Sequence, residues 1–341
     1  MFRFPFEVVR PSTVAEAAEF LSANPGDARV LAGGSDLMAA LNQRLHSPRY
    51  LVDIQGLPGL THVAGDAESG LRIGAMATLR EVERSPLVRR LCPVLARAAG
   101  EVGSVQIRNL GTLGGNLCLD TRCWYYNQSQ FWRGSRPPCL KEGGEECYVV
   151  LRGEGCYALH ASDTVPALIA LDARARVGGA QGEEVRPIES LFTGDGNAPL
   201  ALRPDELVLE ILIPAASLSR RGVYIKYGPK DTIAYPLVGM AVTLALDESE
   251  RVCQEAKIVI GGVASAPLRA PAGEKLLCGL KAADHDGIAE AARAASREVK
   301  IYSDVHSQAG YKREIIRVIA EQAVTEAFGR EDPSEEGGGK E

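Results

Sequence analysis

The 341-residue sequence lacks the features of several common functional classes. It has no apolar run of about 20 residues, the length that a membrane-spanning helix needs. Its first ten residues lack the apolar core and the cleavage site of a secretory signal. It also lacks a basic excess, because 38 Lys and Arg are set against 44 Asp and Glu, which leaves a net charge of −6. These absences argue against membrane and nucleic-acid partners and predict a cytoplasmic protein.

Catalytic motifs are missing as well. No acid–base pair and no nucleophilic triad stands out from the sequence. What is present is ordinary for a globular protein, with 45% apolar and 24% charged residues. The length allows two or three domains, each with its own core. Eight cysteines in a cytoplasmic chain are best interpreted as reduced thiols or metal ligands rather than as disulfides.

Hydrophobic periodicity and turn residues predict an alternation of helices and strands. Thr13 to Glu16 forms a capping box that predicts a helix, followed by a strand at 28–32, a helix at 37–45 and a strand at 50–54. Between about 71 and 177 the pattern indicates glycine-punctuated strands with a few helices. Beyond a boundary near 217–222 we expect strands at 223–226, 238–246 and 256–261 and then two helices, the second at 311–328. Residues 331–341 are acidic and Gly-rich, and are expected to be disordered.

Two loops contain paired glycines, and both are candidates for binding an anion. Paired glycines let the backbone approach a phosphate closely and let successive N–H groups converge on it. A helix follows the first loop at once, which would add its N-terminal N–H groups to the site. Neither loop matches the dinucleotide fingerprint or the phosphate-binding loop, and for either loop taken alone the residues favour a tight turn. The first loop is Val30-Leu31-Ala32-Gly33-Gly34-Ser35-Asp36-Leu37, and the second is Gly111-Thr112-Leu113-Gly114-Gly115-Asn116-Leu117.

The two loops, together with several other segments, resemble the flavin-binding medium subunits of the molybdenum hydroxylase family, which includes xanthine dehydrogenase and CO dehydrogenase. The likeness extends over about residues 4–328 and includes the stretches at 51–54, 73–78, 203–206 and 260–264. The resemblance implies an α+β fold. It would comprise a two-part FAD-binding domain of the PCMH type at 1–217, with subdomains at about 1–55 and 56–217. A smaller CO-dehydrogenase-flavoprotein-like domain of a sheet plus helices would follow at 218–330.

The same resemblance implies a set of FAD contacts. In the family both glycine loops surround the FAD pyrophosphate, an aspartate hydrogen-bonds the flavin side, and a lysine lies close to the flavin. An acidic residue that the family has near position 234 is missing here. Carried over residue by residue, the contacts are Val30, Leu31, Ala32, Gly33, Gly34, Ser35, Asp36, Leu37, Val102, Thr112, Leu113, Gly114, Gly115, Asn116, Asp163, Val208 and Lys226.

Five cysteines lie within an irregular segment at about 118–160, which looks like an insertion. Cys118, Cys123, Cys139, Cys147 and Cys156 are separated by 4, 15, 7 and 8 residues. Structural zinc favours short Cys-x-x-Cys pairs, whereas an iron–sulfur cluster tolerates irregular spacing. The spacing alone leaves both metals open. The remaining three cysteines are scattered in apolar surroundings and are interpreted as core residues.

The insertion resembles that of the 4-hydroxybenzoyl-CoA reductase branch of the family. The connection from Asn116 to Asp163 takes 47 residues, far more than most family members use, and the stretch NLCLDTRCWYY at 116–126 is similar to that branch. The resemblance implies a 4Fe–4S cluster bound by Cys123, Cys139, Cys147 and Cys156. Cys118 stands where the family has a small residue, and is expected to pack rather than to bind metal.

These resemblances imply an electron-transfer subunit whose substrate chemistry takes place elsewhere. The expected partners are a molybdenum–pterin large subunit and a 2Fe–2S small subunit, in a hetero-oligomer expected to be a dimer of heterotrimers. Ferredoxin would donate electrons that pass through the 4Fe–4S cluster and FAD for the reductive removal of a phenolic hydroxyl. One alternative is a flavin subunit that delivers electrons outward to NAD or quinone. Another is a zinc-stapled assembly subunit without redox function.

Overall fold

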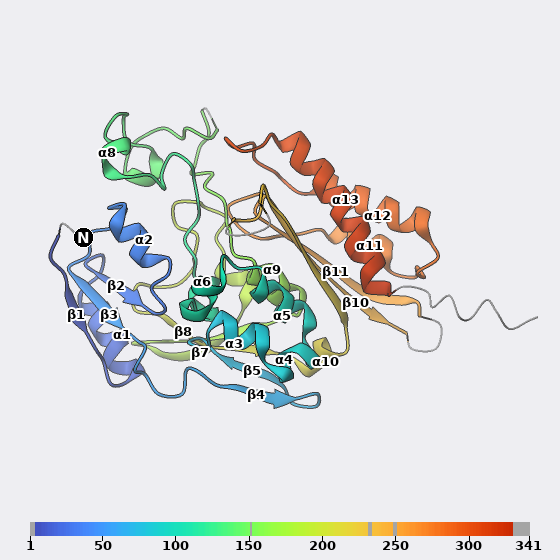
Figure 1. Ribbon diagram of the computed structural model, residues 1–341, viewed down its shortest axis with the longest axis horizontal. Coiled ribbons are helices and arrows are strands. Elements are labelled where there is room, and N and C mark those ends of the chain that lie inside the picture. The colour runs from blue at the N-terminus through green and yellow to red at the C-terminus, as the bar shows by residue number, and fades with distance from the viewer. Residues whose placement is uncertain (1–3, 151, 231–233, 248–250, 330–341) are drawn as a thin grey trace, which may run out of the picture.

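The computed structural model describes residues 4–150, 152–230, 234–247 and 251–329. The tail at 331–341, for which we predicted disorder, lies outside the described residues. Within these ranges the strands form three sheets, with helices packed against them (Figure 1). None of the described helices has both the length and the apolar character needed to cross a bilayer.

The N-terminal part is a small parallel sheet in the order β1-β3-β2. As predicted, a helix begins directly after Thr13, whose hydroxyl accepts a hydrogen bond from the N–H of Glu16 at 3.1 Å. The Glu16 carboxylate accepts from Ser12 rather than from Thr13, so only half of the expected capping box forms. The second helix ends at Asn42, short of the expected residue 45. The elements are β1 (Glu7–Val9), α1 (Val14–Ala23), β2 (Ala28–Leu31), α2 (Leu37–Asn42) and β3 (Tyr50–Asp53).

The middle part is built on a five-stranded antiparallel sheet in the order β4-β5-β8-β6-β7. Its strands are β4 (Val63–Asp66), β5 (Gly70–Gly74), β6 (Arg174–Gly179), β7 (Gly182–Pro187) and β8 (Leu207–Ile213). The short 3-10 helix η2 (Ile188–Leu191) follows β7, and α10 (Ala215–Leu218) follows β8.

Our expectation that 71–177 would be mainly strands was wrong, because the chain between β5 and β6 is mainly helical. The overlooked features are helix starts. Thr78 and Ser104 cap two of these helices with their hydroxyls, and Pro93 occupies the first turn of a third. The helices are α3 (Leu79–Arg84), α4 (Pro86–Leu91), α5 (Pro93–Gly100), α6 (Val105–Leu110), α7 (Leu113–Leu117) and α9 (Thr164–Ala170).

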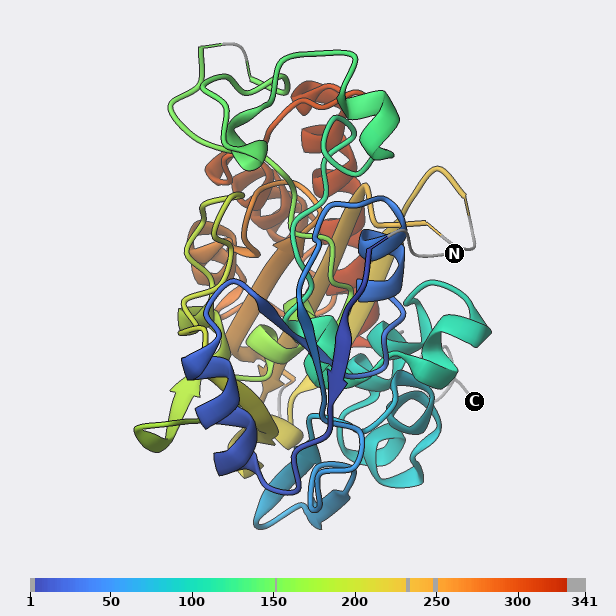
Figure 2. The ribbon, with the colours of Figure 1, turned by 90° about the vertical axis from the view of Figure 1, so that its left-hand side faces the viewer.

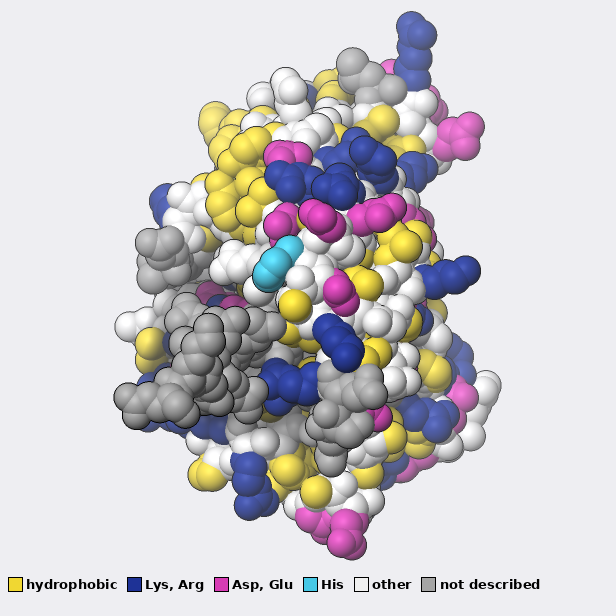
Figure 3. Space-filling view, turned by 90° about the vertical axis from the view of Figure 1, so that its right-hand side faces the viewer, with side chains coloured by type: hydrophobic (Ala, Val, Ile, Leu, Met, Phe, Trp, Pro, Cys, Tyr) yellow, Lys and Arg dark blue, Asp and Glu magenta, His cyan; other side chains and the backbone are white. Residues whose placement is uncertain are grey.

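The C-terminal part is a four-stranded antiparallel sheet in the order β12-β11-β10-β9, covered by helices on its outer face (Figure 1). We expected two helices and the described residues form three, since Pro271 begins an additional one. The elements are β9 (Arg221–Tyr227), β10 (Val238–Leu246), β11 (Cys253–Gly261), β12 (Leu268–Arg269), α11 (Pro271–Leu277), α12 (His285–Glu298) and α13 (Ala309–Phe328). On this side of the molecule, acidic and basic side chains are interspersed (Figure 3).

The middle and C-terminal parts share one apolar core. Tyr224, Ala241 and Val259 of the C-terminal sheet pack into the core that also contains β5, α5 and α9. Every residue of α9 is buried. Asp163, which directly precedes α9, is therefore held at the junction of the two parts.

The cysteine-rich insertion projects from one end of the molecule (Figures 1 and 2). Its described residues form the short helices α8 (Gln130–Arg133) and η1 (Leu140–Glu142) and are otherwise irregular, as the sequence predicts. The Trp124 ring lies 5.5 Å from that of His306, so the insertion also touches the loop that precedes α13. Arg133 fixes the insertion to the end of α2 by donating to the carbonyls of Gln43 and Arg44 at 3.1 and 2.8 Å.

Candidate functional site

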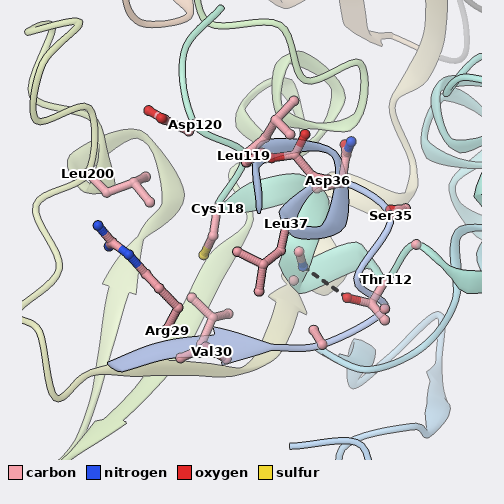
Figure 4. A pocket seen from close by; sticks show the side chains of 18 of the residues that line it. Arg29, Val30, Ser35, Asp36, Leu37, Thr112, Cys118, Leu119, Asp120 and Leu200 are labelled. Atoms are coloured by element: carbon pink, nitrogen blue, oxygen red, sulfur yellow. Dashed lines mark hydrogen bonds between the residues drawn. The ribbon is translucent and has the colours of Figure 1, made fainter. Parts of the chain in front are cut away.

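A cavity of about 860 Å³ lies between the first two sheets, the insertion and the connection from β9 to β10 that carries Ala234 and Tyr235. Ligand pockets typically measure about 300–1,000 Å³, so this one is large enough for a dinucleotide-sized cofactor. Both glycine loops line it, the first at the end of β2 and the second at the start of α7. The structure thus brings together two loops that are far apart in the sequence (Figure 4).

The first glycine loop has backbone N–H groups available to a ligand. Among the described residues, the N–H groups of Gly33, Gly34 and Ser35 have no hydrogen-bond partner. Gly34 has a φ of +70°, a conformation that side chains disfavour. A Cβ on Gly33 would overlap the carbonyl oxygen of Leu110, so the absence of a side chain allows the two loops to pack together. This loop has the free donors that an anion requires.

The second glycine loop differs, because the protein itself uses its N–H groups. The N–H of Gly114 donates to the carbonyl of Ala75 at 2.8 Å, and that of Gly115 to the Thr112 hydroxyl at 3.0 Å (Figure 4). Asn116 donates its N–H to the Thr112 carbonyl at 2.9 Å. The expectation that both loops direct free N–H groups at an anion therefore holds for the first loop only. The second loop braces the cavity.

Asn116 and Asp163 connect the second loop to the C-terminal sheet. The Asn116 side-chain oxygen accepts from the Thr164 hydroxyl at 2.6 Å, which holds the start of α9 beside the loop. The Asp163 carboxylate accepts from the Tyr224 hydroxyl at 2.8 Å and from the Lys226 ammonium at 3.0 Å. Burial raises the pKa of Asp163 to about 6, while the charge of Lys226 opposes the rise.

We predict that Asp163 makes stability depend on pH in one direction. Because burial raises its pKa above the usual value of about 3.9, protonated Asp163 stabilises the fold below about pH 4. That contribution is lost as the pH rises through about 6. Relative to Asp163→Asn, the wild-type chain should lose up to about 3 kcal/mol of unfolding free energy between about pH 4 and about pH 7.5. Urea denaturation of both flavin-free chains measures the difference.

Asp205→Asn is the control, because the pKa of Asp205 is shifted in the opposite direction to that of Asp163. The N–H of Ala180 donates to the Asp205 carboxylate at 2.9 Å and holds the pKa of that group below its usual value. The wild-type chain should therefore gain stability relative to Asp205→Asn as the pH rises. If the wild type also gained stability relative to Asp163→Asn, the charge of Lys226 would outweigh the burial of Asp163.

The structure places most of the residues expected to contact FAD around this cavity. Those that line it are Val30, Ala32, Gly33, Gly34, Ser35, Asp36, Leu37, Val102, Thr112, Gly114, Gly115, Asn116, Asp163 and Val208. Three others do not line it. Leu31 packs behind the first loop, Leu113 is fully buried in the core, and Lys226 is committed to Asp163 and to the carbonyl of Glu101 at 2.8 Å. Lys226 thus holds the Asp163 carboxylate by an ion pair and does not line the cavity itself.

Part of the cavity wall was not expected from the sequence. Residues of the insertion contribute to it, together with Arg29, His46 and the loop that carries Leu200. Asp36, in the first glycine loop, pairs with Arg122 of the insertion, whose guanidinium lies 5.1 Å from the Tyr235 ring. The insertion residues in the wall are Cys118, Leu119, Asp120, Tyr126 and Lys141. The insertion is therefore part of the flavin-site architecture.

A second, small cavity lies within the insertion itself. Cys123, Cys139, Cys147 and Cys156 all line it, together with Tyr125, Tyr126, Leu140, Lys141, Tyr148 and Ala158. These four cysteines are free thiols. Cys118 does not line the second cavity and instead lines the larger one, beside Val30 and Leu37 (Figure 4). The structure thus separates the five cysteines into the same four plus one that the resemblance implies.

Backbone N–H groups near three of the four cysteine sulfurs favour the thiolate and oppose the rise in pKa that burial causes. They belong to Tyr126 and Tyr125 at Cys123, to Lys141 at Cys139 and to Ala158 at Cys156. Despite the N–H of Ala158, burial raises the pKa of the Cys156 thiol to about 11. Such N–H groups around sulfur are typical of iron–sulfur sites, where they adjust the potential.

The described part of the insertion shows no preformed site for a single metal ion. In the ranges that the structure describes, no three His, Cys, Asp or Glu side chains are grouped as a single metal ion requires. A zinc ion needs its thiolates about 2.3 Å away, so this arrangement does not fit it. A 4Fe–4S cluster has four irons, each with its own thiolate, and its ligands therefore stand farther apart.

The aromatic residues of the insertion divide into two groups. Tyr125 and Tyr126 line the cysteine cavity. Trp124 and Phe131 are 48% and 93% exposed. Of these four aromatic residues, Tyr125 and Tyr126 are the ones placed to shield the cysteines from water.

Fold and cavity together define a flavoprotein of the two-part FAD-binding type with a separate C-terminal sheet domain. Residues 4–216 match the family described as "FAD binding domain in molybdopterin dehydrogenase". Residues 224–327 match the "CO dehydrogenase flavoprotein C-terminal domain". The chain belongs to the FAD-binding medium-subunit family of the molybdenum hydroxylases, and is an oxidoreductase flavin subunit.

Characterised relatives support this assignment along most of the chain. The aldehyde oxidoreductase FAD-binding subunit PaoB of Escherichia coli is 33% identical over 281 residues, which cover 80% of this chain and 86% of that one. Subunit alpha of the 6-hydroxypseudooxynicotine dehydrogenase complex of Paenarthrobacter nicotinovorans is 27% identical over 331 residues, which cover 97% of each chain. A structure of carbon monoxide dehydrogenase from Hydrogenophaga pseudoflava superposes with a TM-score of 0.78 at 26% identity, covering 96% of this chain and 99% of that one.

Proposed function

We propose that this chain is the FAD and 4Fe–4S subunit of a molybdenum-containing 4-hydroxybenzoyl-CoA reductase. In this role it carries electrons from ferredoxin toward 2Fe–2S clusters and a molybdenum site on partner subunits, for the reductive removal of the phenolic hydroxyl. The observation that supports this role is the cavity lined by Cys123, Cys139, Cys147 and Cys156, which shares Tyr126 and Lys141 with the larger cavity.

The larger cavity would hold FAD. The free N–H groups of Gly33, Gly34 and Ser35 would bind the pyrophosphate, the second loop would brace them, and Asp163 would face the flavin side. The residues expected from the resemblance that do not line the cavity, Leu31, Leu113 and Lys226, would act by packing or by holding Asp163. FAD and the cluster would supply the redox chemistry.

The described residues of this chain show no acid–base constellation positioned for substrate. Several ionisable side chains of the larger cavity are held by protein partners: Asp163 by Tyr224 and Lys226, Lys141 by Asp120, and Asp36 by Arg122. We therefore assign bond-breaking to a molybdenum–pterin large subunit, with a 2Fe–2S small subunit in a dimer of heterotrimers. The role of this chain is to position the carriers.

A second candidate is a flavin subunit that sends electrons outward to NAD or quinone. The names of the relatives favour it, since subunits of a 6-hydroxypseudooxynicotine dehydrogenase and a carbon monoxide dehydrogenase are among them. The cysteine cavity favours the reductive direction, because an outward flavin subunit has no need for an additional entry cluster.

Anaerobic purification of the whole complex tests the proposal. Beyond the iron of the 2Fe–2S subunit, we expect about four iron and four sulfide per chain, one FAD, and reduction of 4-hydroxybenzoyl-CoA with reduced ferredoxin. The isolated chain should bind FAD noncovalently and show no turnover with reduced dye. Zinc in place of iron and sulfide would reject the cluster. A cluster-bearing complex that reduces NAD or quinone but not the thioester would support the outward direction.

A further inference from the structure

Lys141 lies in the wall between the two cavities. It lines the larger cavity beside Asp120 and Tyr126, and it also lines the cavity of the four cysteines. Tyr126 is the other described residue that lines both. Lys141 alone of the two carries a charge, so it is the charged group that both sites have in common.

The ammonium of Lys141 is fixed in place. Its side chain is 5% exposed, and the Nζ atom donates to Asp120 at 2.7 Å, to the Thr121 hydroxyl at 2.6 Å and to the carbonyl of Gly196 at 2.8 Å. An ammonium has three donors, and all three are used here. The Nζ atom also lies 5.2 Å from the centre of the Tyr126 ring.

The backbone of Lys141 is attached to the cysteine site. Its N–H points at the sulfur of Cys139, two residues earlier. Glu142, the next residue, pairs with Arg133 at 2.8 Å and with Arg136 at 2.7 Å, which anchors the short helix η1. The position of the ammonium is therefore set by the same helix that carries Cys139 to its cavity.

We propose that Lys141 is a positioning residue that couples the two cofactor sites, setting the electrostatic potential at the cluster and at the FAD cavity through its pairing with Asp120. This inference rests on the proposed function, because it requires a cluster in the cysteine cavity and FAD in the larger one. It goes beyond that function in naming one residue through which the two sites influence each other.

The sign of the effect follows from charge alone. A fixed cation favours the electron that reduces a nearby cluster, and so raises its potential. The same cation favours the anionic pyrophosphate of FAD. The Asp120 carboxylate, 35% exposed at its side chain, has the opposite effect on both sites. Removing either charge should therefore move both measurements, and in opposite directions.

Three variants of the full chain in its complex test this. Lys141→Met should shift the cluster midpoint potential to more negative values and weaken FAD binding about tenfold. Asp120→Asn should shift the potential to more positive values and strengthen FAD binding. Lys141→Arg keeps the charge and should stay close to wild type in both. The readouts are a dye-mediated redox titration followed by EPR, and FAD titration of the flavin-stripped protein followed by flavin fluorescence.

The results separate this inference from the proposed function. A wild-type protein without cluster iron overturns the proposed function and the coupling with it. If the wild type contains its cluster but Asp120→Asn leaves the cluster potential unchanged or lowers it, the coupling alone is overturned. Where Lys141→Met assembles no cluster, Asp120→Asn decides, since it keeps the side-chain size and an oxygen that can accept from Lys141.

Discussion

Changing Cys123, Cys139, Cys147 or Cys156 to Ser is expected to remove one 4Fe–4S cluster, which amounts to about four iron and four sulfide per chain. The four side chains line one cavity, and each would bind a different iron of the cluster through its thiolate. Serine provides no thiolate, and the remaining three leave a labile or empty site. Iron and sulfide analysis after anaerobic purification, with EPR of the reduced protein, measures the loss.

Cys118→Ala is the matched control, because Cys118 lies in the same insertion and lines the other cavity. It should retain the full iron and sulfide content. Cys92→Ala, in the fully buried core, tests whether general destabilisation alone can release iron. Loss of the cluster in Cys118→Ala together with its retention in Cys123→Ser would show that the ligand assignment is wrong by one cysteine. Full iron in all of these variants would mean that the insertion binds no cluster.

The fold could be predicted from the sequence where local chemistry determines it. Thr13 starts α1, and the strongly apolar run of β10 at Val238–Leu246 was predicted to the residue. The helices between β5 and β6 were missed because five of the α-helices described there are six residues long or shorter. So few residues barely develop a helical periodicity, and cap residues such as Ser104 look like turn residues.

Only the part of the candidate site that lies in recognisable sequence motifs could be predicted. Paired glycines mark both loops, but the sequence gives them the same role. Only the hydrogen bonds show that the first loop has free N–H groups while Gly114 and Gly115 use theirs. Lys141 lacks any motif, and the tertiary path of the insertion alone brings it to the cavity wall. Tyr224, which donates to Asp163, was missed because its role depends on the packing of one part against the other.

Gly34→Leu is expected to reduce FAD affinity by at least about 100-fold, because two charge-assisted hydrogen bonds would be lost at about 1.5–3 kcal/mol each. Gly34 has a φ of +70°, so a side chain would strain the turn that presents the free N–H groups of the first loop. A Cβ there would lie 3.2 Å from Leu31 Cδ1, within the loop itself. Gly114 is the poorer choice, since its Cβ would lie 2.7 Å from that of Ala75 and disturb the fold.

Gly26→Leu separates flavin loss from backbone strain. Gly26 has a φ of +83°, and nothing lies within 4 Å of the Cβ that a side chain would add there. Both variants therefore carry a left-handed penalty of about 1–2 kcal/mol, and only Gly34→Leu alters the lining of the cavity. Flavin content after purification and FAD titration of the stripped chains should show loss in Gly34→Leu alone, at similar unfolding free energies. Full flavin occupancy in Gly34→Leu would remove the first loop from the pyrophosphate site, because its N–H groups are the free donors that assign it there.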